Sequence, residues 1–151
     1  GFVNRPREAA PHTLGNIEAT GHYTINLIPA NLIEQAHQTS AKYADGESEF
    51  NAVGLTEEFT SYSKAPFVFE SPVKYSMELK EIIPIKFNNT SFVIGSVTGV
   101  FIDEQILAAD GFLDLEKANI ITSLGIDGYY ATEKLARYSY AKPGKELTRI
   151  D

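Results

Sequence analysis

The sequence predicts a mainly β fold of α+β character, in which long strands form a barrel accompanied by short helices. Apolar and polar residues alternate from residue 73 to 79, which is typical of a half-buried strand, and the apolar residues up to 85 continue it. Pro84 then requires a sheet edge or a bulge, because it has no backbone N–H to donate. A turn at 88–90 and a second long strand at 92–102 complete a predicted antiparallel hairpin.

Shorter elements are predicted on both sides of this hairpin. Pro11 suits the first turn of a helix, where a missing N–H costs little, and Gly21 suits the residue after the helix end. Asn31, with Glu34 three residues later, predicts a capping box that opens a second helix. The remaining expectations are a helix over 11–19, a strand over 23–27, a helix to about 39, an irregular segment over 40–66, bulges at Gly95 and Gly99, and a short helix over 114–120.

Length and composition favour one domain spanning residues 1–151. The formal net charge of -7 argues against nucleic acid as a main partner, although it leaves room for one local basic pocket. The chain has no cysteine, which excludes thiolate metal sites and cysteine nucleophiles and fits a cytoplasmic protein. No apolar run approaches the roughly 20 residues that a membrane helix needs.

The segment before the first predicted helix carries the clearest chemical signal. Arg5 and Arg7 lie just before a helix that begins near residues 11–13, and Thr13 adds a hydroxyl donor. A helix N-terminus offers free N–H groups and a partial positive charge, and arginine matches the geometry of phosphate oxygens. This spacing predicts a phosphate site, while the alternative that both arginines are ordinary solvated charges stays open.

Other motifs point to no further chemistry. The histidines have no metal-ligand spacing, and the glycines form neither a dinucleotide-binding nor a P-loop pattern, so we expect no metal site. Four late tyrosines could stack on a flat ring, line a dimer interface or simply pack in the core. They are Tyr129, Tyr130, Tyr138 and Tyr140.

Several segments in order resemble one family. Residues 13–27, TLGNIEATGHYTINL, resemble the TLxNIxxTGxFxVNL stretch of the flavin-reductase-like proteins, the FMN-binding split barrels that include flavoredoxin. Further segments resemble that family in the same order. They are Gln38–Ser40 with Tyr43, Glu49–Phe50, Gly54–Thr56, Glu70–Val73, Phe92–Gly95, and Leu124–Gly125 with Tyr129–Tyr130.

The resemblance implies a split-barrel homodimer that binds FMN near the subunit interface. It implies that the segment from Asn4 to Thr13 holds the phosphate. The candidates for binding the phosphate are Asn4, Arg5, Arg7, His12 and Thr13. The candidates that lie near the flavin ring, or near the path by which a substrate reaches it, are Thr39, Ser40 and Tyr43.

The sequence departs from the family pattern at two places. Family members carry an upstream region that contacts the isoalloxazine ring and completes the barrel, so we expect a split barrel lacking its N-terminal part, with an upstream piece omitted before Gly1. Pro11 and His12 stand where Lys-Asp is common, which removes one basic contact that Arg5 or Arg7 could supply.

The resemblance implies an FMN-dependent oxidoreductase in which NAD(P)H reduces the flavin. Because the cofactor carries the chemistry, no catalytic side chain is assigned. Two alternatives remain: a non-catalytic carrier of the flavoredoxin type that docks to a redox partner protein, and a split-barrel dimer that has lost flavin and acts as a binding module.

Overall fold

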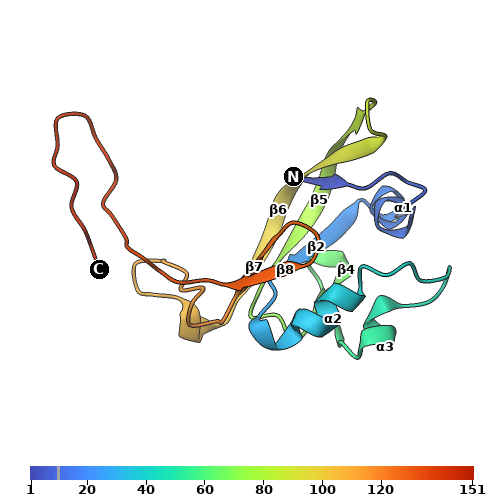
Figure 1. Ribbon diagram of the computed structural model, residues 1–151, viewed down its shortest axis with the longest axis horizontal. Helices are drawn as coiled ribbons and strands as arrows, with labels where there is room; N and C mark the ends of the chain where they lie inside the picture. The colour runs from blue at the N-terminus through green and yellow to red at the C-terminus, as the bar shows by residue number, and fades with distance from the viewer. Residues whose placement is uncertain (10) are drawn as a thin grey trace.

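The computed structural model describes residues 1–9 and 11–151, and a curled antiparallel sheet lies at its centre (Figure 1). The sheet has the strand order β1 (Phe2–Asn4), β6 (Thr90–Ile102), β5 (Val73–Ile85) and β2 (His22–Asn26). The other elements are α1 (Pro11–Thr20), η1 (Ala30–Leu32), α2 (Ile33–Gln38), α3 (Glu49–Val53), β3 (Glu57–Thr60), β4 (Ser63–Val68), η2 (Glu104–Ile106), β7 (Ile121–Leu124) and β8 (Gly128–Ala131). The mainly β prediction is therefore confirmed.

The long β5–β6 hairpin forms as predicted, although its turn lies at residues 86–89 and not at 88–90. Its register shifts twice, once opposite Gly99 and once opposite Gly95, so both glycines lie at bulges as expected. A Cβ at Gly95 would come within 2.4 Å of the Tyr23 hydroxyl, which explains why no side chain fits there. Pro84 lies beyond the part of β5 that pairs with β2, in agreement with the edge prediction.

Helix α1 begins at Pro11 as predicted and ends one residue later than expected. Gly21 follows it with φ +70°, and its N–H donates to the Ile17 carbonyl at 2.8 Å, so the predicted helix end is confirmed. Leu14 and Ile17 are both 3% exposed. They pack in one core cluster with Tyr23, Met77 and Val93, which fixes the helix against the sheet.

Three sequence predictions are wrong. The segment from 40 to 66 is not irregular throughout, because it contains α3 and the β3–β4 hairpin. These strands are short and partly exposed, so their sequence lacks a clear apolar alternation, and pairing with each other and packing on β2 define them instead. The Asn31 capping box is also absent, since η1 leads into α2 and neither N-cap residue makes a side-chain cap bond.

The predicted helix over 114–120 is replaced by turns. Asn119 has φ +49°, and the following residue forms a bridge with Pro29. Ile121 then donates from its N–H to the Ile28 carbonyl at 3.0 Å. These long-range bonds fix residues 120 and 121 beside Ile28 and Pro29, so the turns over 115–119 do not continue as a helix.

Each helix within residues 1–9 and 11–151 is too short or too polar to traverse a lipid bilayer.

Candidate functional site

A small cavity lies where the loop after β1, the first turn of α1 and the end of α2 meet. Its volume is about 60 Å³, and it is lined by six of the eight residues that the sequence singled out. They are Arg5, His12, Thr13, Thr39, Ser40 and Tyr43. We call this cavity the anion corner, because it joins donor groups to a helix N-terminus.

Asn4 supports the corner from outside the cavity, whose lining does not include it. It is 7% exposed, and its register partner on β6 is Ser91. The Asn4 side chain donates from Nδ2 to the Arg5 carbonyl at 2.9 Å. Asn4 therefore positions Arg5 and does not face the cavity.

The end of α2 is held by its own side-chain hydrogen bonds. The Thr39 hydroxyl donates to the Ala36 carbonyl at 2.8 Å, and the Tyr43 hydroxyl donates to the Gln38 carbonyl at 3.3 Å. These bonds stabilise the turn that carries Ser40 into the corner. The two side chains are therefore better suited to shaping the wall than to binding a ligand by their hydroxyls.

The corner contains charges of both signs. Arg5 and Lys42 are exposed cations, and among the described contacts neither side chain forms an ion pair. His12 contacts Asp45, with 2.6 Å between Nε2 and Oδ1, and the Asp45 side chain is 98% exposed. Glu49 adds a carboxylate to the lining. An entering anion would meet two available cations and would compete with Asp45 for His12.

Arg7 lies outside the anion corner. Its guanidinium pairs with the Glu18 carboxylate at 2.7 Å, and the hydrogen bond from this pair raises the pKa of Arg7. Both residues line a different cavity of about 640 Å³, between α1 and the β5–β6 hairpin. The structure therefore separates two arginines that the sequence placed together.

A larger groove of about 950 Å³ adjoins the anion corner, with four lining residues in common. These shared residues are His12, Thr13, Thr39 and Glu49. Apolar side chains of β2 and of the segment from α3 to β4 line much of the rest, among them Ile25, Phe50 and Phe59. The volume lies within the range of small-molecule sites.

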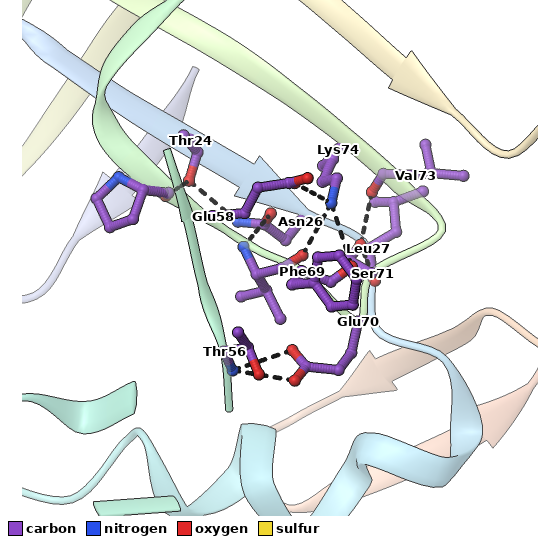
Figure 2. A network of polar contacts seen from close by, with 12 residues as sticks. Thr24, Asn26, Leu27, Thr56, Glu58, Phe69, Glu70, Ser71, Val73 and Lys74 are labelled. Carbon is purple, nitrogen blue, oxygen red and sulfur yellow. Dashed lines mark hydrogen bonds and ion pairs between the residues drawn. The ribbon is translucent and has the colours of Figure 1, made fainter. Parts of the chain in front are cut away.

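A polar network fixes the β3–β4 hairpin that forms one wall of this groove (Figure 2). The Thr24 hydroxyl donates to the Pro66 carbonyl at 2.7 Å, and the Val68 N–H donates to Asn26 at 3.0 Å. These bonds connect β4 to the neighbouring edge strand β2. Between β2 and β4, a hydrogen bond to the Asn26 side-chain amide takes the place of regular backbone pairing. The periodicity of the sequence cannot reveal such a contact.

Lys74 reinforces the same wall from β5. Its ammonium group contacts Glu58 and donates to the carbonyls of Val68 and Phe69 at 3.3 and 3.2 Å. The Lys74 side chain is only 12% exposed, so the pairing is needed to offset its desolvation. The sequence analysis assigned no role to Lys74 or Lys42. Lys42 could have been found, because it lies two residues after the candidate Ser40.

Across the part of the chain that the structure describes, no three His, Cys, Asp or Glu side chains gather closely enough to hold a metal ion.

The curled sheet with a helix N-terminus beside a groove places this chain in the class of split-barrel proteins. Residues 7–116 match the model of the flavin reductase like domain, and the chain belongs to that family. The recognition of the family from the sequence is therefore confirmed.

Solved structures agree with this assignment. A protein with a split barrel domain from Shewanella frigidimarina is 46% identical, with a TM-score of 0.86 over 93% of this chain and 69% of that one. Flavoredoxin of Desulfovibrio vulgaris is 25% identical, with a TM-score of 0.70 over 88% of this chain and 68% of that one.

Curated relatives are longer than this chain. A protein of Aquifex aeolicus is 24% identical over 81% of this chain and 61% of its own length. A second relative, from Deinococcus radiodurans, is 25% identical over 84% of this chain and 58% of its own length. The chain thus spans about three fifths of the curated relatives that it matches.

Proposed function

We propose that this protein is an FMN-dependent oxidoreductase of the flavin reductase kind, which passes hydride from NAD(P)H to the flavin. The observation that carries the proposal is the anion corner opening into a larger groove, in a chain of the flavin reductase like family. One end of such a site suits a charged group and the other suits a flat apolar body. FMN has both parts.

The anion corner fits the phosphate in size and in donor chemistry. Its volume is about 60 Å³, which suits a group the size of a phosphate better than a fused ring system. Arg5 and Lys42 supply charge, Thr13 and Ser40 supply hydroxyls, and the first turn of α1 supplies backbone N–H groups. Within the described hydrogen bonds, these four side chains are not otherwise engaged.

The groove would receive the flat part of the molecule. Its apolar lining around Ile25, Phe50 and Phe59 favours a ring system, and His12 and Thr13 border both spaces. Bound FMN would supply hydride acceptance and release, so the protein needs to bind, orient and shield it and needs no acid or nucleophile of its own. We therefore assign no catalytic residue.

We also propose that the protein works as a homodimer. The family resemblance of the sequence implies a flavin near a subunit interface, and many apolar side chains outside the core are exposed. A dimer would cover part of this surface and would enclose the cofactor more fully than one chain does.

A flavoredoxin-type electron carrier is the second candidate. The similarity to flavoredoxin of Desulfovibrio vulgaris favours it, and so does the net charge of -7, which suits docking to a basic redox partner. In this case the protein would bind FMN and exchange electrons with another protein, without oxidising NAD(P)H by itself.

Visible absorption followed by a nicotinamide assay tests these proposals. The purified protein is mixed with FMN, separated from free flavin and examined for bound flavin, and NADH or NADPH oxidation is then measured with free FMN as acceptor. Turnover supports the reductase, and bound flavin without turnover supports the carrier. A protein that neither retains FMN nor oxidises NADH or NADPH with free FMN would contradict both and would favour a binding module without flavin.

A further inference from the structure

We propose that residues 132–151 form an arm that docks on the body, residues 1–131, of a second copy of this chain. We call this segment the C-terminal arm. The inference rests on the proposed homodimer and goes beyond it by naming the segment that holds the two copies together. Its evidence is the path of the arm, its exposed apolar side chains and its charge.

The C-terminal arm leaves β8 and forms a long loop outside the body (Figure 1). Its base is anchored. The Thr132 hydroxyl donates to the Ile120 carbonyl at 2.7 Å, and the Arg137 guanidinium lies 3.9 Å from the centre of the Phe112 ring. Arg137 also pairs with Asp110. These contacts aim the rest of the arm away from its own body.

Beyond this anchor the arm is bonded to itself. The Ser139 N–H donates to the Thr148 carbonyl at 2.8 Å, and the Ile150 N–H donates to the Arg137 carbonyl at 3.0 Å. Every hydrogen bond and ion pair described for residues 138–151 stays within residues 132–151. The arm is therefore already shaped, so docking would cost less conformational entropy than ordering a free tail.

The arm exposes large apolar side chains that its own body does not cover. Tyr140 is 87% exposed and Leu135 is 78% exposed. Tyr138, Leu147 and Ile150 are each more than half exposed. Apolar surface of this kind is stabilised when another protein surface removes it from water. The exposure therefore points to a protein surface as the partner.

The arm and the body have opposite formal charges. The C-terminal arm contains five Lys or Arg and three Asp or Glu, so its formal charge is +2, whereas the body contains eight and 17, a formal charge of -9. Because residues 138–151 make no described hydrogen bond or ion pair with their own body, the acidic body of another copy is the complementary surface for the basic arm. When each copy lends its arm to the other, the two contacts are identical and the assembly closes as a dimer.

Sedimentation velocity on a matched pair of double variants tests the proposal. Tyr140→Glu with Leu147→Glu places two charges on exposed apolar positions of the arm. Asn51→Glu with Gln105→Glu places two charges on exposed polar positions of the body and removes no apolar surface that the arm could cover. We expect the wild type and the body variant to dimerise equally. The arm variant should dissociate with at least a tenfold larger Kd, and wild-type dimers should weaken as salt rises.

Each result has a defined meaning. A dimer that keeps its Kd in the arm variant, and also after deletion of residues 138–151, would overturn the role of the arm while leaving the dimer intact. A wild type that stays monomeric at tens of micromolar, roughly the concentration at which a dimer of micromolar Kd is mostly assembled, would overturn the arm and the dimer together. FMN titration of the wild type and the body variant judges the flavin proposal separately, because neither alters the arm and the arm positions lie outside the anion corner.

Discussion

At the scale of single residues, Arg5 and Arg7 show how neighbours in sequence diverge in space. Arg5 lines the anion corner, whereas Arg7 pairs with Glu18 and lines another cavity. Both positions carry the same side-chain chemistry and both precede α1. Only Arg5 is therefore expected to contribute directly to phosphate binding.

We expect Arg5→Ala to weaken FMN binding by about 1.5–3 kcal/mol, or roughly 10- to 150-fold in Kd, because one hydrogen-bonded charge is removed from the phosphate. Arg7→Ala is the matched control and should change the Kd by less than about twofold, since surface pairs such as Arg7–Glu18 contribute little. Fluorescence titration measures both. Equal losses in the two variants would place the phosphate outside the anion corner.

Asp45 should act against FMN binding. Its carboxylate contacts His12 in the corner, where a phosphate would also carry negative charge. We expect Asp45→Asn to lower the Kd for FMN about two- to fivefold, because an interaction between solvent-exposed charges contributes little free energy. Glu34→Gln removes an exposed carboxylate of α2 that does not line the corner and should leave the Kd unchanged. A weaker complex with Asp45→Asn would show that Asp45 supports the site.

At the scale of elements, the β3–β4 hairpin depends on polar contacts at both of its ends. Glu70 accepts hydrogen bonds from the Thr56 N–H at 3.0 and 3.2 Å, which ties the start of the hairpin to its exit (Figure 2). Burial acts to raise the pKa of Glu70, but these hydrogen bonds and the charge of Lys74 outweigh it and lower the pKa. The folded protein therefore favours the ionised form.

This shift predicts a pH-dependent contribution to stability. Because the folded pKa of Glu70 is lower than the unfolded pKa of about 4.3, its stabilisation is complete above that value and is lost as pH falls through the folded pKa. We expect Glu70→Gln to lower the free energy of unfolding by about 1 kcal/mol at neutral pH. Urea unfolding at several pH values should show this difference shrinking in acid. A difference that stays constant with pH would exclude the carboxylate as its source.

At the scale of the whole molecule, the anion corner depends on segments from distant parts of the chain. The loop after β1, α1 and the end of α2 converge because β1 pairs with β6 and α1 packs on the sheet through Leu14 and Ile17. A ligand bound there connects these segments in the folded state only. Binding should therefore stabilise the whole fold.

FMN at about 100 times its Kd should stabilise the protein by about 2.7 kcal/mol and raise the Tm by roughly 5–10 °C. Riboflavin, which lacks the phosphate, should produce a much smaller shift at the same concentration, because the anion corner would remain unused. Differential scanning fluorimetry with a reporter dye distinct from flavin, or circular dichroism, measures the shift. Equal shifts for both ligands would count against the phosphate site.

The sequence alone determined the elements that are specified by residues close to one another in the chain. The β5–β6 hairpin follows from apolar alternation, its bulges from Gly95 and Gly99, and the end of α1 from Gly21. These features depend on the conformational preferences of a few adjacent residues, and the ordered family segments add the split-barrel class.

Tertiary structure decided what depends on distant partners. Asn26 and Lys74 hold the β3–β4 hairpin in place through hydrogen bonds to β4 and the segment after it. Residues 114–120 do not form a helix because Ile120 bridges to Pro29. Arg7 pairs with Glu18, whereas Arg5 lines the anion corner. In each case a long-range hydrogen bond or ion pair outweighs a weak local preference, and its partner is brought close only when the sheet closes.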